Sequence, residues 1–98
     1  MRNIVLLCAN GMSTSMMVKK MQDHARQSGY ECQIEAHSID DVKDYADVDI
    51  ILLGPQVKFQ LNKVRSLVHC PVEVIDMTAY GTMNGAKVLE DARKIIGD

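Results

Sequence analysis

One cysteine in this chain is followed directly by small and hydroxyl-bearing residues. After Cys8 come Ala9, Asn10, Gly11, Met12, Ser13, Thr14 and Ser15. A thiolate is a nucleophile, and small residues let a loop turn tightly enough for several backbone N–H groups to face one anion. The hydroxyls at positions 13, 14 and 15 can donate further hydrogen bonds to phosphoryl oxygens. We therefore expect Cys8 to be a nucleophile that holds a phosphoryl group, and residues 9–15 to form its cradle.

The elements on either side would place this thiol at an anion-binding position. Residues 4–7 (Ile-Val-Leu-Leu) form an apolar run typical of a buried strand, and a helix is expected over residues 13–27. The first N–H groups of a helix lack partners within it, and the helix dipole favours negative charge there. A strand-to-helix junction of this kind stabilises a thiolate and binds phosphate.

The loop lacks the cation that a cysteine-dependent phosphatase needs. Such enzymes carry Cys-x5-Arg-Ser, in which the arginine clamps the phosphoryl group with two parallel hydrogen bonds. Here Thr14 and Ser15 stand in those two places, and the nearest cations are Lys19 and Lys20. Without the clamp, hydrolysis of a phosphocysteine should be slow, which favours a phosphoryl carrier over a phosphatase. The alternative from residue types alone is a packing cysteine followed by hydroxyls that merely cap a helix.

Strand-like and helix-like segments alternate along the whole chain. The expected strands are residues 3–8, 32–37, 49–53 and 72–75, and the expected helices are residues 13–27, 40–45, 58–68 and 85–96. This alternation predicts a single three-layer α/β domain over residues 1–98, with helices on both faces of a parallel sheet. With four strands, the expected order is 2-1-3-4, as in flavodoxin-like folds. We expect Asp40 and Asn84 to cap helices and the segment from Asp76 to Gly81 to be a loop.

Ligands of such sheets bind at the carboxyl ends of the strands. Three loops converge there, at residues 8–15, 54–57 and 76–81. The residues expected to flank the site are Gly54, Pro55, Gln56, Asp76 and Tyr80. Asp76 is expected to cap or brace its loop rather than to act in catalysis. For Tyr80 two positions remain open, over the site or packed on the last helix.

Composition excludes several other classes of function. Eleven basic and 13 acidic side chains give a net charge of −2, and the chain has one Phe, three Tyr and no Trp, which argues against nucleic-acid binding. No apolar run approaches the roughly 20 residues of a membrane helix or fits a signal peptide. Cys32 and Cys70 are expected to pack in the interior, and no metal or cofactor motif is present. We expect a cytoplasmic protein with no transmembrane segment.

The cysteine loop resembles a signature of a known family. Residues 8–15, Cys-Ala-Asn-Gly-Met-Ser-Thr-Ser, are similar to the C-x-x-G-M-S-T-S motif of lactose/cellobiose-family enzyme IIB components of the sugar phosphotransferase system (PTS). Residues 52–57 (Leu-Leu-Gly-Pro-Gln-Val), 71–76 (Pro-Val-Glu-Val-Ile-Asp) and 80–81 (Tyr-Gly) look like the family's later landmarks in their usual order. The resemblance spans nearly the whole chain.

This resemblance implies a specific function. In that family the cysteine, here Cys8, receives a phosphoryl group from a histidine of the IIA component. It then passes the group to a β-glucoside or other disaccharide held by the IIC membrane permease. The resemblance also implies a fold like that of low-molecular-weight phosphatases and a transient place at the inner face of the membrane. A monomer is expected, and cellobiose, chitobiose, lichenan fragments and lactose all remain compatible.

Two rival functions have distinct requirements. A cysteine-dependent phosphatase or arsenate-reductase-like enzyme of the same fold would need a cation in place of Thr14. A receiver domain would need an acceptor aspartate at the end of the third strand, where Leu53 and Gly54 stand instead.

Overall fold

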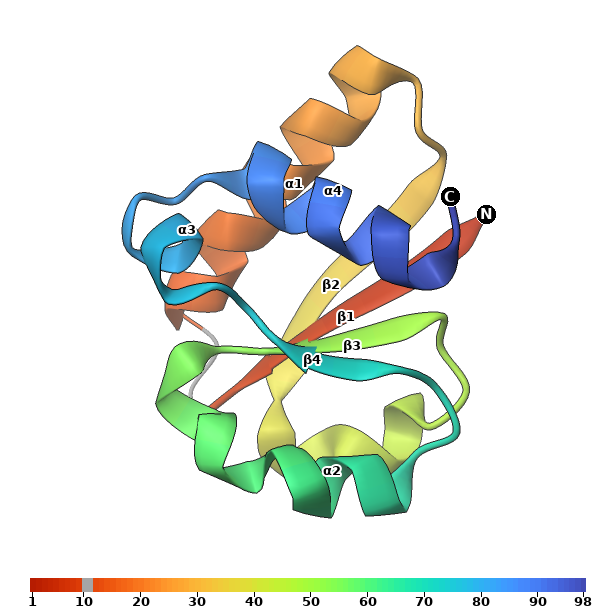
Figure 1. The fold of residues 1–98 in the computed structure, drawn as a ribbon, viewed down its shortest axis with the longest axis vertical. Helices are drawn as coiled ribbons and strands as arrows, with labels where there is room; N and C mark the ends of the chain where they lie inside the picture. The colour runs from red at the N-terminus through yellow and green to blue at the C-terminus, as the bar shows by residue number, and fades with distance from the viewer. Residues whose placement is uncertain (10–11) are drawn as a thin grey trace.

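Four parallel strands form the centre of the molecule. The computed structural model describes residues 1–9 and 12–98 of the chain. The strands are β1 (Arg2–Cys8), β2 (Cys32–Ser38), β3 (Ile50–Leu53) and β4 (Val72–Val74). All pair in parallel in the order β2-β1-β3-β4 (Figure 1), which confirms the predicted topology.

The central position of β1 and β3 follows from their composition. Both strands carry unbroken apolar runs, and each of the residues at 4–7 and 50–53 is buried. Strands covered on both faces need apolar side chains on both faces. By contrast, β2 alternates polar and apolar residues and lies at an edge of the sheet. The register pairs Leu7 with Leu53 and Cys8 with Ser38, so the ends of these strands are level.

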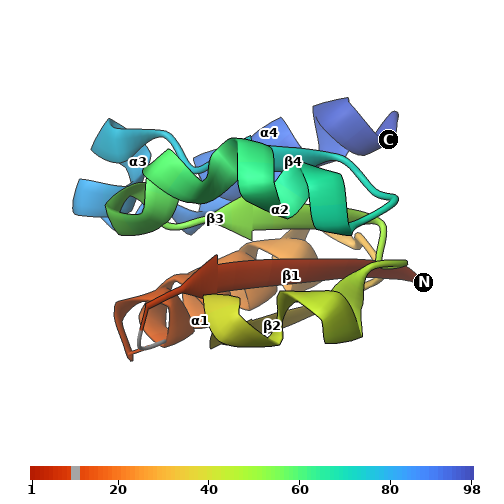
Figure 2. The same ribbon diagram turned by 90° about the horizontal axis from the view of Figure 1, so that it is seen from below.

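Helices cover both faces of the sheet (Figures 1 and 2). On one face α1 (Met12–Ser28) and α4 (Gly85–Ile96) enclose a core with Ile4 and Leu6. On the other face η1 (Ile39–Tyr45), η2 (Pro55–Gln60) and α2 (Leu61–Leu67) enclose a core with Val5 and Leu7. The short helix α3 (Met77–Gly81) lies near the start of α1, at the end where the strands terminate. No helix within the described ranges is long and apolar enough to span a bilayer.

The structure corrects three expectations about local structure. The expected helix over residues 58–68 is divided into η2 and α2, because Pro55 starts a 3-10 turn and Val57 has non-helical dihedral angles. The segment from Asp76 onward forms α3 rather than a loop. The cap of η1 is Ser38 and not Asp40, since the Ser38 hydroxyl accepts from the Asp40 N–H at 3.2 Å.

The last helix matches the expectation in its bounds and in its N-terminal cap. Asn84 accepts from the N–H of Lys87 at 3.1 Å, and Gly97 ends the helix with φ +97°. A side chain at Gly85 would come within 2.6 Å of the backbone at Lys20 and Met21, so glycine permits the close contact of α4 with α1. This contact holds α1, and with it the residues that follow the cysteine loop, against the rest of the fold.

Candidate functional site

Cys8 is the last residue of the central strand β1. Its side chain is only 3% exposed. Helix α1 begins four residues later, at Met12, so the thiol lies between the carboxyl end of a buried strand and the start of a helix. The backbone places Cys8 at the strand-to-helix junction that the sequence predicted.

A buried threonine hydroxyl lies beside the thiol. The Oγ1 atom of Thr14 lies 3.1 Å from Sγ of Cys8, and the Thr14 side chain is completely buried in the first turn of α1. Either group can donate in the neutral state. When Cys8 is a thiolate, the sulfur can only accept, and the Thr14 hydroxyl then donates to it. Thr14 was expected to contribute a hydroxyl to the cradle, and the structure places that hydroxyl beside the sulfur.

The rest of the predicted cradle is described only in part. Ala9 and Ser15 are exposed, and Ser15 belongs to the first turn of α1. Asn10 and Gly11 lie outside the described residues, as do the side chains of Met12 and Ser13.

Gly54 lies directly against Cys8 on the neighbouring strand end. Its N–H donates to the carbonyl of Leu7 at 2.9 Å, which continues the β1–β3 pairing by one residue. A Cβ atom at Gly54 would lie 3.4 Å from the Cβ of Cys8 and 2.8 Å from Oε1 of Gln56. A residue without a side chain therefore leaves room for both groups. Pro55 follows at the start of η2 and fixes the direction in which the chain departs.

A hydrogen bond between Gln56 and Tyr80 connects η2 to α3 at this end of the molecule. The Nε2 group of Gln56 donates to the hydroxyl of Tyr80 over a long distance of 3.5 Å. The ring of Tyr80 is buried in the core beneath α1 and α4. Of the two positions left open for Tyr80, its ring occupies the packed one, while its hydroxyl points to Gln56, next to Gly54.

Asp76 has a structural partner. Its Oδ2 atom accepts a hydrogen bond from the N–H of Ala79 at 2.9 Å and so caps α3. This is the capping role expected from the sequence.

Other titratable side chains have partners of their own. His24 pairs with Glu90, and His37 pairs with Glu35. Cys32 and Cys70 pack at the margins of the two cores, where burial raises the pKa of both thiols. Within residues 1–9 and 12–98, no three His, Cys, Asp or Glu side chains are grouped as metal ligands would be.

The sequence indicated Cys8, Thr14 and Gly54 as residues of the site, but not the contacts between them. The burial of Thr14 depends on how α1 packs on the end of β1, and the contact of Gly54 with Cys8 depends on the register of the sheet. The signal for Gly54 is topological, because in a 2-1-3-4 order the residue after β3 lies level with the end of β1.

The fold and site together define a flavodoxin-like α/β protein with a cysteine at the carboxyl edge of its parallel sheet. The family model for the "PTS system, Lactose/Cellobiose specific IIB subunit" matches residues 3–91. The chain belongs to this family of PTS IIB components.

Individual relatives are similar over nearly their full length. An oligo-beta-mannoside-specific EIIB component of Bacillus subtilis (strain 168) is 41% identical, with 98% of this chain and 97% of the relative covered. A galactose-specific EIIB component of Lactococcus lactis subsp. cremoris (strain MG1363) is 39% identical, with 95% and 94% covered. The solution structure of a cellobiose-specific IIB protein from Borrelia burgdorferi has a TM-score of 0.81 and 35% identity, with 98% and 92% covered.

Proposed function

We propose that this chain, over residues 1–98, is a cytoplasmic phosphocarrier of a sugar phosphotransferase system and that Cys8 carries the phosphoryl group. The donor is a phosphohistidine of a IIA component, and the acceptor is a sugar held by a IIC permease. The observation that supports this proposal most directly is the Cys8–Thr14 pair at the start of α1. The family membership supplies the two partners.

In the first transfer, Cys8 attacks as a thiolate. A sulfur lone pair forms the S–P bond while the N–P bond of the phosphohistidine breaks, and the electron pair of that bond returns to the imidazole ring. Thr14 donates to the sulfur before attack and holds it in one orientation. The N–H groups at the start of α1, together with residues 9–15, would stabilise the phosphoryl oxygens in the transition state.

In the second transfer the roles are reversed. A sugar hydroxyl attacks phosphorus, the S–P bond breaks, and the electron pair returns to sulfur to regenerate the thiolate. The hydroxyl proton passes to a base, which we place in the permease. The relatives are named for oligo-β-mannoside, galactose and cellobiose, so closely similar IIB chains serve different sugars. We infer that the permease selects the sugar and that this chain works as a monomer, transiently at the membrane.

Two features favour a carrier over a phosphatase. Thr14 stands where a cysteine-dependent phosphatase has its arginine clamp, so hydrolysis lacks the cation that stabilises its transition state. The carboxylate of Asp76, which follows the fourth strand, is bound to the N–H of Ala79 and caps α3, so it does not serve as an evident general acid. The phosphothiol should therefore persist until an acceptor arrives.

The test is intact-protein mass spectrometry after incubation with phosphoenolpyruvate, the general PTS proteins and a purified IIA of the same family. We expect a gain of about 80 Da, the mass of one phosphoryl group. Cys8→Ser should abolish the gain, while Cys70→Ser, the matched control at a packing cysteine, should keep it. Release of inorganic phosphate from small phosphoesters, without stable labelling of Cys8, would contradict the carrier function.

A further inference from the structure

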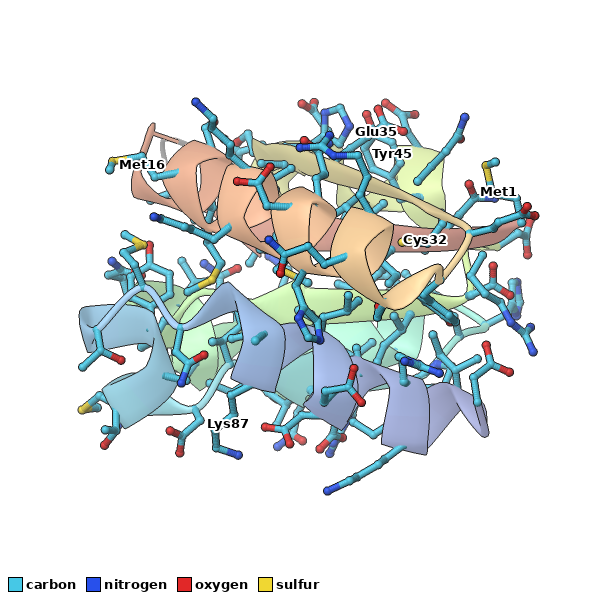
Figure 3. All side chains as sticks on the ribbon, turned by 90° about the horizontal axis from the view of Figure 1, so that it is seen from above. Met1, Met16, Cys32, Glu35, Tyr45 and Lys87 are labelled. Carbon is cyan, nitrogen blue, oxygen red and sulfur yellow. The ribbon has the colours of Figure 1, made fainter. Side chains whose placement is uncertain are left out.

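The side-chain amide of Gln56 borders the same small space as the side chain of Cys8. A Cβ atom at Gly54 would lie 2.8 Å from Oε1 of Gln56 and 3.4 Å from Cβ of Cys8. This space lies at the end of the molecule where α1 begins, and Figure 3 shows Met16 of α1 at that end and Met1 at the opposite one. Cys8 is buried and Gln56 is exposed, so a group that extends from the thiol toward solvent on this side passes the amide.

The backbone fixes the turn that carries Gln56. The N–H of Gly54 donates to the carbonyl of Leu7 at 2.9 Å, and the carbonyl of Gly54 accepts from the N–H of Val57 at 3.0 Å. The turn is therefore closed on itself and attached to β1 one residue before Cys8. A side chain on a backbone held in this way loses little conformational freedom when it binds a ligand.

The hydroxyl of Tyr80 lies at the other end of the same amide. Nε2 of Gln56 donates to this hydroxyl at 3.5 Å. The Tyr80 ring packs in the core with residues of α1 and α4, which fixes the place of its hydroxyl. A phenol hydroxyl can donate or accept, and an amide has one group that donates and one atom that accepts. The pair can therefore form with the amide in either of two orientations related by a half turn.

A phosphoryl group on Cys8 would select one of these two orientations. It brings about two negative charges and three acceptor oxygens. In the structure the carbonyl oxygen of Gln56 faces Gly54 and Cys8, and phosphoryl oxygens would repel it. After a half turn, Nε2 faces the phosphoryl oxygens and donates to them, while Oε1 accepts from the Tyr80 hydroxyl. Both ends of the amide then have partners.

We propose that Gln56 binds the phosphoryl group of phosphorylated Cys8 through its side-chain amide and that Tyr80 is the positioning residue for this contact. A neutral amide holds phosphoryl oxygens without the positive charge by which an arginine clamp favours hydrolysis. This inference rests on the function proposed above and adds a phosphoryl-binding residue from outside the cysteine loop.

Side-chain amide resonances of the isotope-labelled chain test the contact with no partner protein bound. The chain is phosphorylated with phosphoenolpyruvate, the general PTS proteins and IIA, and is then separated from them. We expect the NH₂ resonances of Gln56 to shift on phosphorylation, and the shift to be smaller in Tyr80→Phe. Those of Gln60 should stay in place, because Gln60 belongs to the same short helix but lines a separate hollow with Val42 and Val64.

Single-turnover labelling of Cys8 at saturating donor gives the second readout. Gln56→Leu should slow labelling about tenfold, because one hydrogen bond to a charged group is lost. Gln56→Glu should slow it further, since a carboxylate repels the phosphoryl group, whereas Gln60→Glu makes the same charge change in η2 and should have no effect. Tyr80→Phe should slow labelling in the unmodified chain but not in the Gln56→Leu background, because Tyr80 acts through Gln56.

Gln56 amide resonances that stay in place on phosphorylation would overturn the proposal. Labelling rates of both Gln56 variants within twofold of the unmodified chain would also overturn it. Additive effects of Tyr80→Phe and Gln56→Leu would overturn the positioning role of Tyr80. Absence of labelling in the unmodified chain would instead defeat the carrier function itself.

Discussion

At the scale of single residues, the contact between Cys8 and Thr14 links structure to chemistry. A buried hydroxyl 3.1 Å from a buried sulfur has a defined direction, unlike a hydroxyl in solvent. Hydrogen bonds to charged groups are about twice as strong as those between neutral groups. In the mechanism proposed above, Thr14 therefore stabilises Cys8 most in the thiolate state in which it attacks.

Replacement of Thr14 by valine tests this role. We expect the rate of Cys8 phosphorylation at saturating donor to fall about tenfold or more, since one hydrogen bond to a charged group is lost. Thr14→Ser keeps the hydroxyl and should retain most of the rate. Single-turnover labelling followed by mass spectrometry measures both. Equal rates for the valine and serine variants would show that the hydroxyl has no part in transfer.

Asp76 gives a second prediction at this scale. Its carboxylate caps α3 through the N–H of Ala79, so Asp76→Asn should preserve both the cap and the rate of phosphoryl transfer. Asp76→Ala should reduce the free energy of unfolding by about 1 kcal/mol. Urea denaturation and the labelling assay provide the two readouts. A large loss of transfer rate in the asparagine variant, with normal stability, would assign Asp76 a chemical role.

The sequence was most informative about residue types and least informative about their surroundings. The position of Cys8 at the end of a strand and the caps Asn84 and Asp76 could be predicted because each follows from the local sequence. The burial of Thr14 could not, because it depends on how α1 packs on the end of β1. The position of the Tyr80 ring was undecided for the same reason, since its place in the core is set by α1 and α4.

At the scale of elements, the contact of α1 with α4 limits how the helices can move. Gly85 lies where a Cβ atom would be 2.6 Å from backbone atoms of Lys20 and Met21. The backbone of α1 cannot move aside as the end of a flexible side chain can. The two helices can therefore be this close only with glycine at position 85.

Gly85→Ala should therefore force α4 away from α1. We expect the free energy of unfolding to fall by at least about 2 kcal/mol, although alanine is the better helix former. Gly81→Ala is the matched control, because a Cβ atom there meets nothing within 4 Å. Urea unfolding of the two variants makes the comparison. Equal stability of both would contradict the close contact.

Elements with strong patterns were predicted well, and short ones were not. The continuous apolar runs of β1 and β3 and the apolar stripe of α4 leave little choice of structure. By contrast, η2 has six residues and α3 has five, too few for a periodic pattern to be distinguished from a loop. Both short helices lie at the end with Cys8, so the least predictable backbone surrounds the site.

At the scale of the whole molecule, an ionic cluster joins the two chain ends. Arg2 donates to both carboxylate oxygens of Asp98, at 2.9 and 3.1 Å, and also to Asp49 at 3.2 Å. The hydroxyl of Tyr30 donates to Asp98 at 2.6 Å. The hydrogen bonds from Arg2 and Tyr30 lower the pKa of Asp98 from 3.8 to about 2.

The lowered pKa of Asp98 predicts a dependence of stability on acid. Asp98 is ionised more readily in the folded chain, so its contribution is complete above pH 3.8 and is lost as the pH falls toward 2. Asp98→Asn should be less stable than the unmodified chain near neutral pH and should approach it at the acid limit. Urea unfolding across this range measures the difference. A constant difference at every pH would show that Asp98 does not titrate with folding.

Both chain ends lie at the end of the molecule opposite the start of α1, η2 and α3 (Figures 1 and 2), and the hydrogen bonds from Arg2 to Asp98 join them. A surface tether, fluorescent label or fused protein attached at either end of the chain would therefore leave the opposite end of the molecule, with Cys8, uncovered. Because Arg2 and Asp98 already hold the two ends together, joining them by a short linker would create a circular chain with little added strain. Such a chain could be immobilised with its Cys8 end facing solution, in a single orientation suitable for measuring successive encounters with different partners.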